Sequence, residues 1–175
     1  MTMTNESMQA LTIDQQGHLP AGKGDHRWFL NHLATVKVTA GDAAPKMTAV
    51  EFTAPRGFGP PLHVHHEEDE IMYVLDGEIR LDLGETSQVA STGSVVSLPH
   101  GVPHVFQVVS EQARFLTITS GGAAHPTFDR FVQELGVPTD PTALPTPGEI
   151  DPGHVARVCA DHGIEVLGPP PAHLT

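Results

Sequence analysis

Two histidines and a glutamate in the segment 57–77 have the spacing of ligands to one metal ion. His63 and His65 are two residues apart, and on a β-strand residues i and i+2 share a face. Both imidazoles can therefore reach one point in space. Glu70 opens the next expected strand, where its carboxylate can join them. A lone His-x-His pair is a weak signal, so the interpretation needs further support.

A second segment supplies a third imidazole. The sequence of residues 93–107 predicts a turn, a short strand and a second tight turn, followed by His104 at the start of another strand. Three imidazoles and a carboxylate suit Fe, Mn, Ni, Co, Cu or Zn, and ligand type alone does not choose among these metals. A structural zinc site would more often use cysteine, which these segments lack. We predict one divalent transition metal held by His63, His65, Glu70 and His104.

Other residues of these segments have less specific interpretations. His66 points to the face opposite His65, and His100 lies in the turn before His104, so we expect both at the surface. The acidic run 67–69 is expected to be a solvated loop at the barrel rim. Met72 and Phe106 share the inward faces of Glu70 and His104. We predict that they line a substrate pocket, although inward apolar residues are more often core.

Short alternating segments surround these residues. Strands are expected at 35–40, 46–53, 70–76, 78–83, 95–98, 104–109 and 114–119. The first two should pair antiparallel, and the Asp76-Gly77 pair predicts a hairpin between the strands on either side of it. Many short strands at close spacing predict an all-β sandwich or barrel.

Apolar residues recur with a helical period in two places after residue 122. The first helix covers 128–135, with Thr127 placed to cap its start and Gly136 its end. A Pro-rich linker leads to a second helix that Asp151 can cap. We therefore divide the chain into an N-terminal arm at 1–25 that is partly disordered, a barrel at 26–122, and a helical extension with the Pro-rich linker at 123–175.

The two histidine segments resemble the two signature motifs of the cupin family. The first motif has a glycine, five residues, His-x-His, three or four residues, a glutamate, six residues and a glycine. The second has a glycine, five residues, Pro-x-Gly, two residues and a histidine. Every position is matched, by Gly57, His63, His65, Glu70, Gly77, Gly93, Pro99, Gly101 and His104. The family's asparagine, after three more residues, is Val108 here, a departure that touches no ligand.

This resemblance implies a cupin barrel, a double-stranded β-helix or jelly roll, followed here by two short C-terminal helices. The sequence most resembles small single-domain bacterial cupins similar to quercetin 2,3-dioxygenase, and this resemblance extends over residues 28–170. It implies a metal-dependent oxygenase that acts with dioxygen on a small enolisable or phenolic substrate. Glu70 would be both a metal ligand and the base that accepts a proton from the substrate hydroxyl. Dimerisation is common in the family, so a homodimer is expected.

Two other functions remain open. The same site could serve acid–base chemistry in an isomerase, lyase or cyclase. The chain could also be a non-catalytic protein that binds a small molecule, since cupin barrels host many unrelated activities.

The overall charge narrows the class of partner. Nine basic and 21 acidic residues give a formal net charge of -12, which repels nucleic acids and anionic membrane surfaces. Cys159 is the only cysteine, so no intrachain disulfide is possible. The sequence shows neither a secretion signal nor a segment of membrane-spanning length. We expect a soluble cytoplasmic protein with a small-molecule substrate and with no nucleic-acid or membrane partner.

Overall fold

A computed structural model of the protein describes residues 13, 17–41, 46–121 and 126–172. Most of the predicted N-terminal arm, residues 1–12 and 14–16, lies outside the described residues, and with it the expectation of disorder there. Residues 42–45 and 122–125 also lie outside them.

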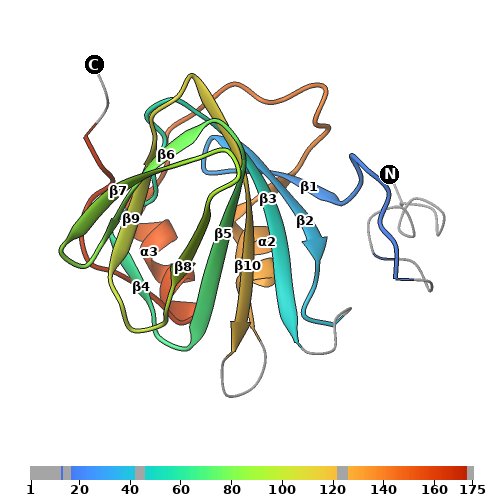
Figure 1. Ribbon diagram of the computed structural model, residues 1–175. Helices are drawn as coiled ribbons and strands as arrows, with labels where there is room; N and C mark the ends of the chain where they lie inside the picture. The colour runs from blue at the N-terminus through green and yellow to red at the C-terminus, as the bar shows by residue number, and fades with distance from the viewer. Residues whose placement is uncertain (1–12, 14–16, 42–45, 122–125, 173–175) are drawn as a thin grey trace.

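Antiparallel strands form two sheets that pack on each other around an apolar core (Figure 1). The seven-stranded sheet consists, in spatial order, of β11 (Val137–Pro138), β1 (Asp25–Phe29), β2 (His32–Val38), β3 (Met47–Pro55), β10 (Gln112–Gly121), β5 (Glu68–Asp76) and β8 (Val95–Leu98). The five-stranded sheet consists of β12 (Ile164–Val166), β4 (His63–His65), β9 (His104–Val108), β6 (Glu78–Leu83) and β7 (Thr86–Ser91). This is the all-β barrel expected from the sequence.

Buried and exposed residues alternate along the neighbouring strands β5 and β10 of the seven-stranded sheet. Every second residue of β5 from Glu68 to Val74 is buried, and β10 alternates in the same way. The register places Val74 opposite Phe115 and Met72 opposite Thr117. Burying a side chain such as Phe115 contributes about 1.5–3 kcal/mol relative to leaving it in water. One face of each strand therefore belongs to the core.

The predicted hairpin at Asp76-Gly77 is wrong. β5 pairs with β10 and β8, whereas β6 pairs with β9 and β7 in the other sheet. The turn is real, because Gly77 has φ +80°, but it carries the chain from one sheet to the other. A local turn signal cannot say which strands will pair, because pairing depends on how the whole barrel closes.

The structure contains more strands than were predicted, whereas several predicted strands lie where they were expected. β6 and β8 have the predicted bounds, and β2 pairs antiparallel with β3 as expected. β1 and β7 were not predicted. β7 is polar and exposed at all but one position, and it forms because it pairs with β6 along its whole length. Its sequence has no hydrophobic alternation to reveal it.

Both predicted helices are present, as α2 (Phe128–Leu135) and α3 (Pro152–Asp161). Asp151 caps α3 as expected, because its Oδ1 accepts hydrogen bonds from the backbone N–H groups of Gly153 at 2.9 Å and His154 at 3.2 Å. Thr127 and Gly136 occupy the N-cap and C-cap positions of α2 as predicted, but the Thr127 side chain makes no capping bond. The Thr127 hydroxyl instead donates to Glu68, 3.1 Å away.

The C-terminal segment is built into both sheets. β11 pairs with β1, and β12 pairs with β4 so that Ile164 lies opposite His65. The helix α2 contacts β1, β2 and β3, while α3 contacts β12 and α2. Residues 126–172 therefore complete the core. Among the described residues, no helix combines the length and apolar character needed to cross a membrane.

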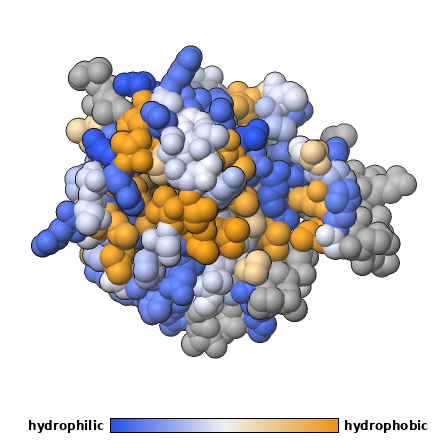
Figure 2. All heavy atoms as spheres, in the orientation of Figure 1, coloured by the Kyte–Doolittle hydropathy of each residue, from blue (hydrophilic) through white to orange (hydrophobic). Residues whose placement is uncertain are grey.

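The outer face of the seven-stranded sheet carries exposed apolar side chains. Figure 2 shows apolar surface on the face that Figure 1 turns toward the viewer, where β5, β8 and β10 lie in front of the helices. The exposed large apolar residues of these strands are Ile71 and Tyr73 of β5 and Val95 of β8. Ile71 and Tyr73 alternate with the buried residues of β5, as expected for the outer side of a barrel strand.

Candidate metal centre

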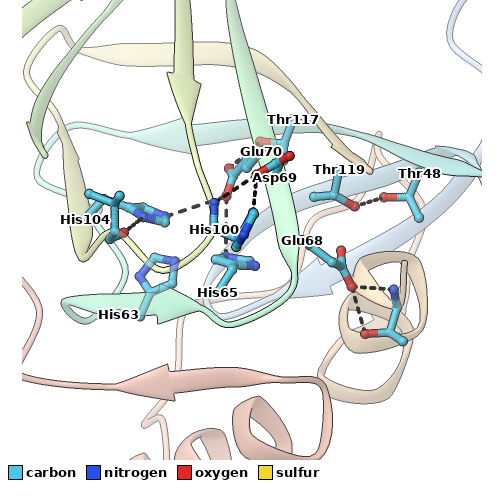
Figure 3. A network of polar contacts seen from close by, with 12 residues as sticks. Thr48, His63, His65, Glu68, Asp69, Glu70, His100, His104, Thr117 and Thr119 are labelled. Carbon is cyan, nitrogen blue, oxygen red and sulfur yellow. Dashed lines mark hydrogen bonds and ion pairs between the residues drawn. The ribbon is translucent and has the colours of Figure 1, made fainter. Parts of the chain in front are cut away.

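The four predicted ligands converge from three strands of the two sheets (Figure 3). β4 carries His63 and His65, and His104 opens the neighbouring strand β9 directly opposite His63. Glu70 comes from β5 in the other sheet. One nitrogen or oxygen atom of each residue lies within 4.8 Å of the corresponding atoms of the other three. This spacing matches a set of side chains arranged around one ion.

Two nitrogen atoms of the cluster lack hydrogen-bond partners, and a bound metal ion would supply a partner for both. Glu70 Oε2 lies 3.4 Å from His65 Nε2 and 3.7 Å from His104 Nε2. Both of these nitrogens are buried and have no hydrogen-bond partner. A buried polar atom without a partner costs free energy, and coordination would remove this cost. The residues present therefore fit a transition metal bound by nitrogen and oxygen.

Backbone carbonyls hold two of the imidazoles in the orientation that ligands need. His63 Nδ1 lies 2.8 Å from the carbonyl oxygen of Pro61, and His104 Nδ1 lies 3.0 Å from that of Val102. A carbonyl only accepts, so each Nδ1 carries the proton and each Nε2 keeps a lone pair. Such outer hydrogen bonds fix the tautomer and ring direction of metal-binding histidines.

The protonation states of the cluster follow from burial and mutual charge. Burial, followed by the charges of His104 and His65, lowers the pKa of His63 to about 4. Burial also lowers the pKa of His65. Burial alone would raise the pKa of Glu70, but its interactions with His104 and His65 outweigh this and lower the pKa to about 2. An ionised carboxylate and neutral imidazoles are the forms that bind metals.

Glu70 has the opposite effect on the pKa of His104. Burial would lower the pKa of His104, but the interaction with Glu70 outweighs it and raises the pKa. Thr117 adds a weaker contact, because its hydroxyl donates to Glu70 Oε1 over 3.5 Å. The carboxylate therefore has polar neighbours on both of its oxygens.

The turn of the second motif is fixed against the first motif. Gly101, at φ +74°, donates its backbone N–H to the carbonyl of His65 at 2.8 Å. The backbone N–H and the Nδ1 of His100 lie 3.0 and 2.7 Å from Asp69 Oδ1. These contacts hold the start of β9 next to β4, which is why His104 reaches the cluster. His100 is exposed, as the sequence predicts.

The residues beside the cluster mostly lie where they were expected. His66 is exposed and pairs with Glu165 at 3.0 Å, so it takes no part in the centre. The expectation of a solvated acidic run is wrong for Glu68, which is buried. Glu68 Oε1 accepts hydrogen bonds from the backbone N–H of Thr127 at 2.6 Å and from its hydroxyl at 3.1 Å. Its charge lies at the N-terminus of α2, where a helix favours an anion.

An apolar cavity of about 80 Å³ opens next to the cluster. All seven phenylalanines of the chain line it, namely Phe29, Phe52, Phe58, Phe106, Phe115, Phe128 and Phe131. Val155 and Cys159 of α3 also contribute, together with the four residues of the cluster. The C-terminal helices therefore form part of the cavity wall.

Of the two predicted pocket residues, the structure places only Phe106 in the cavity wall. Met72 is fully buried in the core and does not line this cavity. It points inward as expected, but Val96 and Thr117 lie opposite it in the neighbouring strands. Sequence reasoning also missed His32, which lines the cavity from β2. No motif marks His32, so nothing in its local sequence singles it out.

The comparison with known families agrees with this geometry. The cupin domain family matches residues 50–119, a range that includes all four residues of the cluster. Residues 50–119 therefore match a cupin domain, and the barrel has the cupin fold. The cupin domain thus contains the cluster and the central strands, while β1, β2 and the C-terminal helices lie outside the matched range.

Two curated proteins show sequence similarity to this chain. It is 30% identical over 108 residues to quercetin 2,3-dioxygenase of Bacillus subtilis, a match that covers 61% of this chain and 32% of that enzyme. It is 45% identical over 56 residues to an uncharacterized protein of Streptomyces coelicolor, covering 31% of this chain and 52% of that protein. The matches span a third to a half of the relatives' own lengths.

Among solved structures, the cupin barrel is similar to a cupin 2 conserved barrel domain protein from Salinispora arenicola. The TM-score is 0.51 at 23% identity, and the match covers 67% of this chain and 96% of that one. At this identity the likeness shows the fold alone.

Proposed function

We propose that this cupin is a metal-dependent oxygenase that acts with dioxygen on a small enolisable or phenolic substrate. The observation that carries the proposal is the position of the cluster, with three imidazoles and one carboxylate facing a cavity lined by seven phenylalanines. A bound metal would act as a Lewis acid that stabilises negative charge on a substrate oxygen. The similarity to the Bacillus enzyme supports the same reaction type.

The side chains of the cavity determine how a substrate would be held. Glu70 is the only carboxylate that lines the described cavity, and its role is to accept the proton from the substrate hydroxyl. Thr117 keeps the Glu70 carboxylate in place through its hydroxyl. The phenylalanine walls exclude water from the reacting atoms. A neutral apolar molecule with one acidic hydroxyl fits these groups.

The size of the cavity favours a compact substrate. Its volume of about 80 Å³ is smaller than the roughly 150 Å³ that accommodates benzene in an engineered protein core. A bound ring must therefore displace part of the wall, and a single ring needs less displacement than the three rings of a flavonol. We propose a one-ring hydroxy-ketone or phenol as the substrate class.

Oxygen consumption tests this proposal. The protein is purified without added metal, its metal content is measured, and an oxygen electrode then follows its reaction with one-ring hydroxy-ketones, phenols and flavonols. We expect oxygen uptake that depends on metal and disappears in Glu70→Gln. Complete metal occupancy without oxygen uptake across this panel would refute the oxygenase.

A second candidate keeps the site but uses no dioxygen. The single carboxylate in the cavity wall favours proton transfer, as in an isomerase, lyase or cyclase in which Glu70 moves a proton. Turnover of the same compounds under anaerobic conditions would support this candidate. Ligand binding with no turnover under either atmosphere would support a non-catalytic small-molecule-binding cupin.

The expectations about assembly and location also remain proposals. We propose a homodimer, which sedimentation measurements would test, and a cytoplasmic location. A small molecule remains the proposed partner, with no role for nucleic acids or membranes.

A further inference from the structure

One polar side chain of the cavity wall takes no part in the metal centre. His32 opens β2 and is 2% exposed. Its ring contacts three phenylalanine rings, with centroid distances of 4.0 Å to Phe58, 5.3 Å to Phe29 and 5.4 Å to Phe52. An imidazole buried among aromatic rings loses its contact with water, and it needs hydrogen-bond partners to offset that loss.

The hydrogen bonding of His32 leaves one nitrogen free to accept. Nδ1 lies 3.2 Å from the carbonyl oxygen of Leu30, so Nδ1 carries the proton. Burial lowers the pKa of His32 to about 4, against a smaller opposite effect of the bond to Leu30, and the ring is neutral at neutral pH. Nε2 therefore keeps its lone pair. No described residue is hydrogen-bonded to Nε2.

The turn that presents His32 is held in an unfavourable conformation. Leu30 and Asn31 have φ values of 47° and 65°, in the left-handed region that residues other than glycine rarely adopt. Asn31 makes two hydrogen bonds with Gly148 of the Pro-rich linker, donating to its carbonyl at 2.7 Å and accepting from its N–H at 3.0 Å. Strain that is maintained by such contacts often occurs at binding sites.

We propose that His32 Nε2 accepts a hydrogen bond from a second hydroxyl group of the substrate, on the side of the cavity formed by Phe29, Phe52 and Phe58. This inference rests on the proposed function, because it assumes that the first hydroxyl of the same molecule lies at the cluster. It narrows the substrate class to compact one-ring hydroxy-ketones with another hydroxyl group. A site built around a buried acceptor discriminates against an analogue that lacks the donor.

A matched pair of compounds tests this role. Kojic acid and allomaltol are one-ring hydroxy-ketones that differ only in a hydroxymethyl group in place of a methyl group. Their affinities are measured by calorimetry for the wild-type protein loaded with zinc. Since one hydrogen bond is worth about 0.5–1.5 kcal/mol, we expect kojic acid to bind roughly two- to twelvefold more tightly. The ¹⁵N resonance of His32 Nε2 should shift with kojic acid and stay in place with allomaltol.

Three variants separate hydrogen bonding from packing. His32→Phe keeps an aromatic ring but removes the acceptor, so we expect it to lose the preference and to change allomaltol affinity less than twofold. His32→Gln keeps an acceptor and should retain part of the preference, which gives a second test if His32→Phe folds poorly. His154→Phe, at an exposed position of α3, is the control and should behave as the wild type.

Several outcomes would overturn the proposal. Equal affinity of the wild type for the two compounds would do so, as would an unchanged preference in His32→Phe or the failure of both compounds to bind. The outcome for the oxygenase is separate. A preference that depends on His32, together with no oxygen uptake, would support this role of His32 and refute the proposed reaction.

Discussion

Glu70 Oε2 lies 3.4 Å from His65 Nε2 although the two residues belong to opposite sheets. The carboxylate is the only negative ligand of the cluster. Burial lowers the pKa of His63 and His65, whereas the interaction with Glu70 raises the pKa of His104. Closure of the barrel therefore brings together groups that would be costly to bury separately. A metal ion at this point would add coordination to an arrangement that the fold already holds.

The first prediction concerns the three imidazoles. His63→Ala, His65→Ala and His104→Ala should each lower the metal content at least about tenfold, because each removes one ligand. They should also lower the melting temperature of the metal-loaded protein, since metal binding contributes to folding free energy. Elemental analysis and calorimetry measure both effects. The control is His66→Ala, at an exposed neighbouring position, and full metal content in all three variants would rule out the centre.

The second prediction separates binding from proton transfer at Glu70. Glu70→Gln keeps the size of the side chain and one coordinating oxygen, so we expect metal content near that of the wild type. An amide cannot accept the substrate proton, so we expect turnover to be lost. Steady-state kinetics at measured metal occupancy check this. Normal turnover would remove Glu70 from the role of base.

The third prediction concerns Glu68, which accepts two hydrogen bonds from Thr127 at the start of α2. Glu68→Ala leaves the partly buried N–H of Thr127 without this partner and removes the anion at the helix N-terminus. We expect the free energy of unfolding to fall by about 1–3 kcal/mol. Urea denaturation measures the change, with Glu85→Ala at an exposed position as the control. Equal stability of Glu68→Ala and the wild type would contradict this role.

The fourth prediction is a pH dependence that arises at His32. Burial lowers its pKa from the ordinary 6.5 of a histidine to about 4 in the folded protein. Above pH 6.5 both states are neutral, whereas below it the unfolded chain binds a proton that the folded protein does not. The free energy of unfolding should therefore fall between pH 6.5 and pH 4, by up to about 3 kcal/mol.

The variant His32→Phe tests this assignment, because it removes the titrating group and keeps an aromatic ring in the core. Denaturation of the metal-free proteins at several pH values should give a smaller loss of stability for the variant than for the wild type. Burial is the largest cause of the lowered pKa of His32, and the bond to Leu30 acts in the opposite direction. Identical pH profiles would show that the loss arises elsewhere.

The fifth prediction compares two glycines with positive φ. A Cβ at Gly77 would lie 2.3 Å from the backbone oxygen of Gln112, whereas a Cβ at Gly84 would meet no atom within 4 Å. Both alanine variants carry the cost of a left-handed conformation, about 1 kcal/mol or more. We expect Gly77→Ala to destabilise the protein further, because backbone must move. Similar losses for the two variants in thermal denaturation would contradict the steric argument.

Local sequence was sufficient for the elements whose signal lies within a few residues. The alternation in β6 and the helical period of α2 gave the bounds of both elements, and the spacing of His63, His65, Glu70 and His104 matched their convergence in the structure. These features depend on which face of a strand or helix a residue occupies, and that follows from the backbone geometry of each element.

Long-range packing decided the remainder. The sequence around Asp76-Gly77 specified a turn, but only the closed barrel assigned β5 and β6 to different sheets. Glu68 belongs to an acidic run. It becomes a buried hydrogen-bond acceptor only because the start of α2 packs against it. His32 reached the cavity because distant phenylalanines surround it. The amino-acid sequence by itself determined which side chains could bind a metal, whereas the tertiary structure alone determined what surrounds them, because the partners of a buried group come from distant parts of the chain.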